Sequence, residues 1–477
     1  MRDGLVTSEQ CLACEVCCRF HEAGSLMAPV FSAAEMAAAD RAGLTDEAFC
    51  RAGYGRSEPV ILQRGRGHWT CPAFDETANR CCIYAARPLD CRLYPFVLTF
   101  DEAGQSVHLA ADLACPQVVD NLCTSRLVER AQHLARSIDG SLWQGLGRDA
   151  AFVAFRRPEF EVLALLPEVT RSVCRPDLGL ARLTPQAIAE LQLFFSADGR
   201  EPAHHALAPI FVWTDLFNLY YRVAGDRLLL FGEEGGAAFL WLPPVGSGPM
   251  APAVEEAVEI LRRLGREPET WRIDNVAEDQ LPILTGLGLR AAERTEEFIY
   301  DRARLAAPTG RRYHGMKASC NVFVKQNEPV AFEPFSDADI PEALALQRRW
   351  ASARLATYTD AFYRAQIEAA MLMHYRTMRH AGAFGLVGRS LRAGERLVGY
   401  TFGFSLPGTE TAVILIEVAD LAVKGAAAYL FREFARSWAP LKRINAMGDS
   451  GLPNLRRAKM AQHPQALLPV HTVRPPA

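Results

Sequence analysis

Cysteine is concentrated at the start of this chain, and this feature limits what the N-terminal segment can fold into. Eleven of the thirteen cysteines fall within the first 123 residues, and the stretch CLACEVCC, residues 11–18, holds four of them. Structural disulfides are rare in a reducing compartment, where free cysteines more often bind metals or fill small core positions. The clustering therefore predicts a segment organised around metal ions.

The spacing inside this stretch indicates the kind of metal site. Cys11, Cys14 and Cys17 form C-x2-C-x2-C, the start of the bacterial ferredoxin pattern, in which a tight loop wraps three thiolates around one face of an iron–sulfur cluster. A zinc ribbon would carry a second C-x2-C pair, and the sequence has none. Adjacent thiols such as Cys17 and Cys18 project in different directions, so the two are not expected to bind the same ion. Two metal sites with four ligands each would use eight cysteines.

Further thiols follow in CPAFDETANRCCIYAARPLDCRLYPF, residues 71–96, and at Cys115. A proline after Cys71 and after Cys115 stiffens the backbone beside the thiol, as in ferredoxin loops. Arg87 and Arg92 could offset the negative charge of a thiolate-rich site. Four isolated cysteines are expected to be small core residues: Cys50, Cys123, Cys174 and Cys320.

The order CLACEVCCRF, CPAF, CCIY, ARPLDCRLYPF and a later CP resembles a cysteine-cluster family that is proposed to chelate zinc or iron. The resemblance covers about residues 8–125, and Cys81 is an addition to the pattern. A similar cluster occurs in flagellin lysine methylases, which resemble iron–sulfur proteins, so the resemblance favours a 4Fe-4S cluster, with zinc as the alternative. It implies the following metal ligands: Cys11, Cys14, Cys17, Cys18, Cys71, Cys82, Cys91 and Cys115.

Composition sets broader limits. With 477 residues the chain should form two or three domains. A net charge of -3 gives no general reason to expect DNA or RNA binding, so any RNA contact would need a local basic patch. The N-terminal residues lack a secretion signal, and no apolar stretch is long enough to span a membrane, which predicts a cytoplasmic protein without an integral membrane segment.

The remainder of the chain predicts an α+β multidomain fold. After a helical, alanine- and arginine-rich connector, LTPQAIAELQLFF from Leu183 and FSDADIPEALALQRRW from Phe335 both indicate a capped turn and an amphipathic helix. A hairpin follows each, with turns at Gly225-Asp226 and Gly394-Glu395. The predicted domains are a metal-binding domain (1–125), the connector (126–177) and two tandem GNAT-like units (178–305 and 306–477).

In the second unit, the apolar run TAVILIEVAD leads into a helix that opens at Lys424-Gly425. The start of such a helix can present backbone N–H groups to a phosphate or carbonyl group. An acyl-coenzyme A enzyme of the GNAT fold would have R/Q-x-x-G-x-G/A here. Ala422 stands where the arginine or glutamine belongs, so acetyl-coenzyme A is not favoured as the donor.

RRYHGMKASCNVF near residue 311 and INAMGDSGLPNLRRAKMAQHP from Ile444 resemble the C-terminal domain family of phosphatidylglycerol lysyltransferase. This family has a tandem GNAT fold and is related to aminoacyl-tRNA-dependent peptidyltransferases; the resemblance runs from about residue 178 to 470. The family's membrane-embedded portion has no counterpart here, so the acceptor could be a small molecule, a lipid or a protein. The string N-x-x-x-D-x-G-L-x-x-LR-x-AK falls on Asn445, Asp449, Gly451, Leu455, Arg456 and Lys459.

The resemblance implies transfer of an aminoacyl group from aminoacyl-tRNA to an amine or hydroxyl. Glu417 and Asp449 are the predicted catalytic carboxylates, as base or amine anchor, although acids at strand ends and turns are often only capping groups. Arg311, Arg312 and Arg457 could add to a groove for tRNA phosphates. The predicted substrate-binding residues are His314, Lys317, Asn321, Lys424, Asn445, Arg456 and Lys459.

Two alternatives stay open. The chain could be an iron–sulfur protein-modifying enzyme that resembles flagellin lysine methylase, which predicts S-adenosylmethionine binding, although no glycine-rich nucleotide loop follows a strand. It could also be a non-catalytic, metal-stabilised binding protein. Retention of function after replacement of both Glu417 and Asp449 would favour this last alternative.

Overall fold

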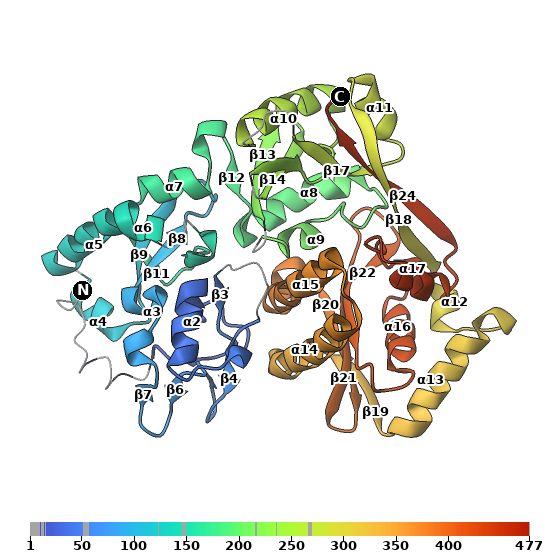
Figure 1. Ribbon diagram of the computed structural model, residues 1–477. Helices are drawn as coiled ribbons and strands as arrows, with labels where there is room; N and C mark the ends of the chain where they lie inside the picture. The colour runs from blue at the N-terminus through green and yellow to red at the C-terminus, as the bar shows by residue number, and fades with distance from the viewer. Residues whose placement is uncertain are drawn as a thin grey trace. The chain divides into compact units, whose positions relative to one another are not determined.

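The computed structural model describes residues 10, 14, 16–50, 57–122, 124–145, 149–214, 217–234, 236–265 and 270–476. The chain forms two compact units (Figure 1). Unit 1 comprises Met1–Ala187 and Glu368–Tyr375, and unit 2 comprises Ile188–Ile367 and Arg376–Ala477. None of the described helices has the length and apolar character needed to cross a membrane.

The first part of unit 1 is built from two-residue strands and one capped helix. Ser32 and Glu35 form a capping box at the start of α2 (Ala33–Arg41), and its buried side packs into a small core around Phe31 and Phe49. Strands this short bury little apolar surface, as expected of a segment that needs another source of stability. The strands are β1 (Arg19–Phe20), β2 (Val30–Phe31), β3 (Glu58–Pro59), β4 (Gln63–Arg64), β5 (Trp69–Thr70), β6 (Phe74–Asp75) and β7 (Arg80–Cys81).

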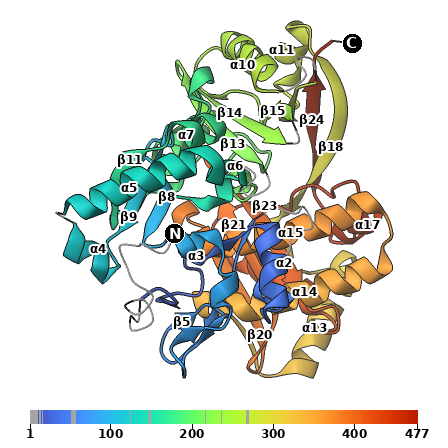
Figure 2. The same ribbon diagram turned by 60° about the vertical axis from the view of Figure 1, so that its left-hand side comes forward.

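The second part of unit 1 has a four-stranded sheet in the order β10-β8-β9-β11. Helix α5 packs on β11, and Trp143 is buried in the same core (Figure 2). The segment 126–177, expected to be a helical connector, therefore also contributes two strands. The elements are α3 (Leu89–Leu93), β8 (Phe96–Phe100), β9 (Val107–Asp112), α4 (Pro116–Asn121), α5 (Ser125–Ser137), α6 (Trp143–Gly145), β10 (Val153–Ala154), β11 (Phe160–Leu165), α7 (Pro167–Val173) and β12 (Ala181–Arg182).

Unit 2 is organised around one long sheet, whose strands follow the order β13-β14-β15-β17-β24-β18-β23-β22-β21-β20-β19, with β16 paired to β14. Figure 1 shows α14 and α16 on opposite sides of β20–β22. The strands are β13 (Asn218–Ala224), β14 (Arg227–Glu234), β15 (Ala237–Leu240), β16 (Val245–Gly246), β17 (Arg272–Ala277), β18 (Arg290–Asp301), β19 (Val330–Pro334), β20 (Val387–Ala393), β21 (Arg396–Ser405), β22 (Thr411–Ala419), β23 (Arg443–Asn445) and β24 (Ala466–Arg474).

Helices occur in unit 2 at the positions where the sequence analysis predicts them. The helix expected after Leu183 is α8, and the helix expected after Phe335 is α14. Both predicted hairpins are confirmed, since β13 pairs with β14 and β20 with β21 across two-residue turns. The helices are α8 (Ile188–Asp198), α9 (Leu207–Phe211), α10 (Met250–Leu264), α11 (Leu281–Gly286), α12 (Arg302–Ala306), α13 (His314–Asn327), α14 (Ile340–Thr357), α15 (Ala361–His380), α16 (Ala426–Ser437) and α17 (Pro453–Met460).

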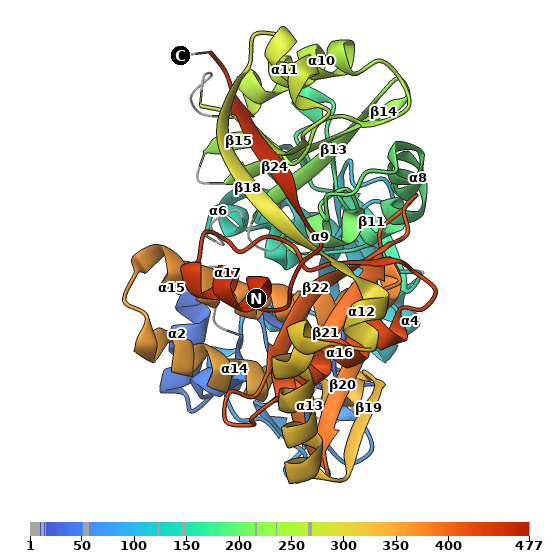
Figure 3. The same ribbon diagram turned by 90° about the vertical axis from the view of Figure 1, so that its right-hand side faces the viewer.

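The C-terminal strand β24 joins the two halves of this sheet. It runs antiparallel to β17 on one side and to the long strand β18 on the other. Figure 3 shows β24 beside β18. Strand β18 in turn pairs with β23, so that segments far apart in the sequence alternate in the middle of the sheet. The boundary expected between the two GNAT-like units, at 305/306, lies between β18 and β23 in the sequence. In the sheet, however, these two strands are neighbours.

Candidate active site and thiol cluster

Strands β22 and β23 part in the middle of the sheet. Their parallel pairing runs only from Thr411–Arg443 to Val413–Asn445, although β22 continues to Ala419. Beyond Asn445 the chain stays with β18 instead, because the Ala446 N–H donates to the Phe298 carbonyl (3.0 Å). The second half of β22 therefore faces an opening in the sheet rather than a hydrogen-bonded neighbour on this side.

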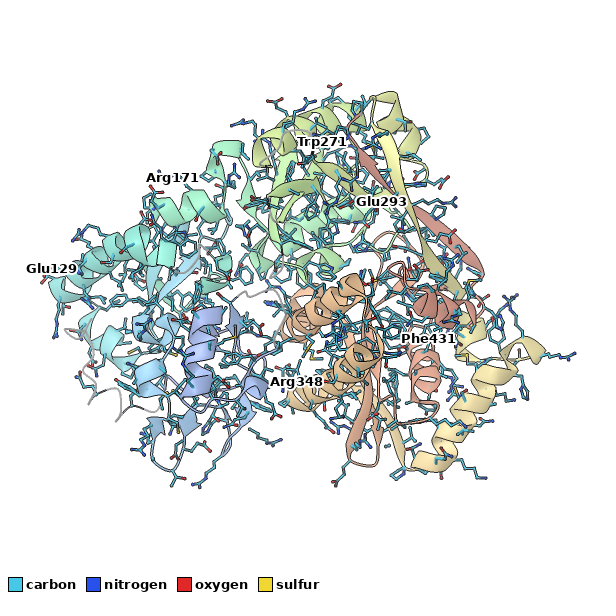
Figure 4. All side chains as sticks on the ribbon, in the orientation of Figure 1. Glu129, Arg171, Trp271, Glu293, Arg348 and Phe431 are labelled. Carbon is cyan, nitrogen blue, oxygen red and sulfur yellow. The ribbon has the colours of Figure 1, made fainter. Side chains whose placement is uncertain are left out.

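Glu417 lies on this unpaired half of β22. Its Oε2 atom is shielded from solvent and accepts no hydrogen bond from the described part of the chain. Burial raises the pKa of Glu417 to about 8, and the positive charge of Lys459 opposes this rise. Burial also raises the pKa of Tyr300, with a contribution from the nearby Glu417 carboxylate. Phe431 on α16, labelled in Figure 4, packs edge-on against the Tyr300 ring at 5.4 Å.

Lys459, on α17, acts on Glu417 through its charge and holds the loop that follows β23 through hydrogen bonds. Its Nζ atom donates to the carbonyls of Ala446 (2.6 Å) and Gly448 (2.6 Å). Burial lowers the pKa of Lys459 to about 8, while the carboxylates of Asp449, Glu297 and Glu417 act in the opposite direction. Lys459 thus holds the loop and also places a positive charge near the buried glutamates.

Glu297 on β18 is a second buried carboxylate. Its Oε2 atom accepts hydrogen bonds from Asn445 Nδ2 (2.6 Å) and from the backbone N–H of Ala203 (2.9 Å). Burial raises the pKa of Glu297 to about 7, and these two donors limit the rise. Asn445 also accepts a hydrogen bond from the Met447 N–H (2.7 Å), so that its side chain holds both Glu297 and the start of the loop.

Asp449 and Arg456 form a separate interaction on the outer side of this loop. The Asp449 carboxylate accepts hydrogen bonds from the Gly451 N–H (3.0 Å) and from Arg456 Nη1 (3.1 Å), and Arg456 Nη2 donates to Glu296 (2.8 Å). The loop needs such support because Met447 and Ser450, which are not glycines, both have left-handed backbone conformations. The geometry gives Asp449 a turn-stabilising contact, while its catalytic role stays a prediction.

Three predicted substrate-binding residues share the outer face of α13. His314, Lys317 and Asn321 are exposed and follow one another at helical spacing, whereas Met316 and Phe323 on the opposite face are buried. Lys424 is also exposed, at the loop before α16. These four side chains are exposed on the surface, whereas the carboxylates of Glu297 and Glu417 are buried.

The start of α16 is closely covered by α13. Gly425 has a φ of +85°, and a Cβ atom there would lie 2.2 Å from the Ser319 carbonyl oxygen and 3.0 Å from Phe323 Cβ. Only glycine fits this close, left-handed position. The start of α16 is therefore held closely against α13.

In unit 1, one group of thiols comes together from four separate segments. Burial raises the pKa of Cys71 to about 12, and the neighbouring thiols of Cys18 and Cys81 add to this rise. Burial also raises the pKa of Cys91 well above its usual value, and the neighbouring thiols of Cys71, Cys18 and Cys81 add to this rise. We call Cys18, Cys71, Cys81 and Cys91 the thiol cluster.

Cys81 belongs to the thiol cluster, whereas the sequence interpretation selected its neighbour Cys82 as a ligand, which stays a prediction. Cys81 is the last residue of β7, which pairs with β6 opposite Phe74, and Cys82 is exposed. Successive residues in an extended segment point in opposite directions, so a Cys-Cys pair can direct only one thiol to the cluster. That rule is the sequence signal that could have identified Cys81.

Three further predicted metal ligands, Cys14, Cys17 and Cys115, are among the described residues. Cys17 and Cys115 are close enough to Tyr94 for their charges to raise its pKa, although burial is the main cause. Cys14 is half-buried, and Cys11 lies outside the described residues, as does Cys123. Cys50, Cys174 and Cys320 are buried, as expected for core positions.

The donor chemistry of the thiol cluster suits zinc or iron, because both metals bind thiolates. Without a cation, the raised pKa values keep Cys71, Cys81 and Cys91 protonated, whereas a bound metal ion favours the thiolate form. Within the described ranges, however, no three His, Cys, Asp or Glu side chains are already arranged to hold a metal ion. Binding would therefore require the thiols to move closer together.

Two family models match the chain. One is described as "Phosphatidylglycerol lysyltransferase, C-terminal" and matches residues 199–474, which is more than half of the chain. The chain belongs to this family. The second, described as "Putative zinc- or iron-chelating domain", matches residues 10–117. Both resemblances inferred from the sequence are confirmed, and so is the fold class, with a tandem GNAT-like region after a cysteine-rich segment.

Solved structures with this fold include a conserved protein of unknown function from Bacteroides thetaiotaomicron. It is 20% identical, with a TM-score of 0.55, and the match covers 62% of this chain and 99% of that one. A second is the structure of L-PGS from Bacillus licheniformis, at 15% identity and a TM-score of 0.45, covering 60% of this chain and 90% of that one. No curated protein matches the chain.

For this member of the lysyltransferase C-terminal family, the sequence interpretation omitted Glu297. The residue stands directly before the apolar triplet Phe298–Tyr300, and an acid in that position usually marks a strand end. It is buried because the neighbouring strands β23 and β24 come from segments more than a hundred residues away. No local pattern in the sequence indicates that pairing.

Proposed function

We propose that unit 2 is an acyltransferase that moves an aminoacyl group from aminoacyl-tRNA to an amine or hydroxyl acceptor. The family supports aminoacyl or acyl transfer in general. The observation that carries the proposal is Glu417: a buried carboxylate with a free Oε2 atom, within the described residues, at the opening between β22 and β23. The proposed donor implies a reaction in the cytoplasm, and the acceptor could be a small molecule, a lipid or a protein.

Glu417 would act as the general base. The N–H or O–H group of the acceptor attacks the carbonyl carbon of the aminoacyl ester while its proton passes to the Glu417 carboxylate. The new C–N or C–O bond forms, and the ester C–O bond to the terminal ribose of the tRNA breaks. The proton then passes from Glu417 to the departing ribose oxygen, which leaves as a hydroxyl group. Glu417 returns to its carboxylate form.

The surrounding residues would set the basicity and position of Glu417. A pKa of about 8 makes it a better proton acceptor than an ordinary glutamate, although only a minority is ionised at pH 7. Lys459 would keep this pKa from rising further and would hold the loop that follows β23. Asn445 and Glu297 would position the same loop from the other side.

The test is transfer of a labelled amino acid from charged tRNA to the components of a cell extract. Glu417→Gln keeps the shape of the side chain but cannot accept a proton, so we expect transfer to fall by about 10²- to 10⁴-fold. Glu410→Gln is the matched control, because Glu410 directly precedes the same strand and is exposed beside Lys442. Absence of transfer by the wild-type protein, or equal transfer by Glu417→Gln, would contradict the proposal.

For unit 1 we propose that the thiol cluster binds the metal implied by the chelating family, with Cys11, Cys14, Cys17 and Cys115 as candidates for a second set of ligands. Bound metal would supply cross-links between segments that have few apolar contacts of their own. For the second set, the C-x2-C-x2-C spacing of Cys11, Cys14 and Cys17 favours a 4Fe-4S cluster over zinc. Anaerobically purified protein should then contain iron and acid-labile sulfide, and colourless protein with stoichiometric zinc would contradict the iron–sulfur assignment.

A further inference from the structure

The exposed face of α13 carries an unneutralised row of positive and polar side chains. His314, Lys317, Asn321 and Lys325 occupy positions i, i+3, i+7 and i+11 and are all exposed. At 100° per residue these positions fall within an arc of about 80°, and at 1.5 Å per residue they extend over about 16 Å. We call these four residues the α13 stripe.

The stripe lies in a segment that contains no acidic residue. From Gly310 to Asn327 the sequence has Arg311 and Arg312 in addition to the two lysines, but neither aspartate nor glutamate. None of these four cations has a carboxylate partner among the described residues. The protein as a whole has a net charge of -3, so this local excess of positive charge is a distinct feature of the surface.

Several arginines elsewhere in unit 2 are held in ion pairs. Arg396 pairs with Asp420, and Arg456 pairs with both Glu296 and Asp449. Such pairs neutralise charge and leave those side chains less available to an anionic partner. The cations of the α13 segment have no carboxylate partner among the described residues. They can therefore bind an external anion without first breaking an ion pair.

We propose that the α13 stripe, with Arg311 and Arg312, binds the phosphate backbone of RNA. Lys317 and Lys325, separated by about 12 Å along the helix, and the preceding Arg311 and Arg312 match a polyanion with regularly spaced phosphates, since each contact releases condensed counterions and adds to the affinity. The inference rests on the proposed function and deepens it, because it assigns the surface that receives the tRNA donor.

An RNA partner fits this helix better than an anionic membrane does. Membrane-binding amphipathic helices insert an apolar face that carries Leu, Phe or Trp. The apolar face of α13 is already buried in the core through Met316, Cys320 and Phe323, and no large apolar side chain is exposed on this helix. The stripe therefore offers charge and hydrogen bonds but no surface for insertion.

The test measures binding of uncharged tRNA to the full chain by fluorescence anisotropy at several salt concentrations. With about 0.7 counterions released per contact, each cation contributes roughly fivefold at 0.1 M salt. We expect Lys317→Gln/Lys325→Gln to bind about 25-fold more weakly and to show a shallower dependence on salt. The single variant Lys317→Gln should lose about fivefold, which keeps the test informative if the double variant does not fold.

Arg64→Gln/Arg66→Gln is the matched control, because these arginines are exposed on another surface and also have no ion pair among the described residues. This variant should bind tRNA within about twofold of the wild type. Unchanged binding by Lys317→Gln/Lys325→Gln would overturn the inference. Binding to vesicles that contain phosphatidylglycerol is measured in a separate experiment. If the wild type binds these vesicles through the α13 stripe but does not bind tRNA, the surface recognises lipid, and the RNA inference is overturned.

The two proposals can fail separately. If tRNA binds through the stripe but charged tRNA donates no amino acid, the proposed reaction is wrong and the RNA surface stands. If wild-type protein transfers an amino acid and the stripe variant binds tRNA and transfers equally well, the reaction stands and the RNA surface is wrong.

Discussion

Replacement of Glu417 by glutamine should stabilise the protein while it removes the proposed activity. In the folded protein the pKa of Glu417 is raised from 4.5 to about 8. Between these pH values the folded state keeps a proton that the unfolded chain has released, so stability falls as the pH rises. Glutamine has no proton to release and escapes this loss.

The size of the effect follows from the same two values. At about 1.4 kcal/mol per pH unit, the wild type loses at most about 5 kcal/mol of stability between pH 4.5 and pH 8. The Glu417 residue keeps some exposed surface although its Oε2 atom is shielded, and solvent screening should reduce this figure to about 2–4 kcal/mol. The difference between Glu417→Gln and the wild type should therefore be near zero at pH 4.5, grow with pH, and level off above pH 8.

The measurement is urea unfolding of both proteins at pH 5, 6, 7 and 8, followed by tryptophan fluorescence. Hydrogen exchange of the β22 peptide at each pH provides a local readout, which matters because the chain has two compact units. Glu410→Gln should show no such pH-dependent gain. A Glu417→Gln protein that is no more stable than the wild type at pH 8 would refute the reasoning.

Two further pairs of variants test other parts of the structure. Cys81→Ser should lose most of the bound metal, measured by elemental analysis of purified protein, whereas Cys82→Ser should keep it; the reverse result would restore the original ligand assignment. Gly425→Ala combines a left-handed backbone with a close contact and should cost about 2–4 kcal/mol of unfolding free energy. Gly385→Ala, left-handed but in open space, should cost only about 1 kcal/mol, so equal losses in urea unfolding would contradict the packing argument.

The sequence predicted the elements of unit 2 well because their signals are local. Two-residue turns between alternating apolar strands determine the hairpins β13–β14 and β20–β21. The helical pattern after Leu183 corresponds to α8, and the capping box of Ser336 and Asp339 precedes α14. The position of β24 could not be predicted in this way. Its partners β17 and β18 lie more than 160 residues earlier in the chain, and no short pattern records which strands pair over that distance.

The site was predictable to a similar extent. Glu417 and Lys459 could be selected from a strand end and a family motif, but their shared environment depends on where β22 and β23 separate. In unit 1 the number and spacing of the cysteines indicate metal binding, whereas the choice between Cys81 and Cys82 depends on the direction of one thiol at the end of β7. Long-range pairing and side-chain direction are the two kinds of information that the sequence alone did not supply.

The most direct test of the proposed reaction is the pH dependence of single-turnover transfer from charged tRNA. If Glu417 is the base, the rate should rise about tenfold per pH unit below pH 8 and then level off, because only the ionised carboxylate accepts the proton. Glu417→Gln should give a low rate without this inflection. A wild-type rate that does not change between pH 6 and pH 8, or the same inflection in Glu417→Gln, would contradict the account.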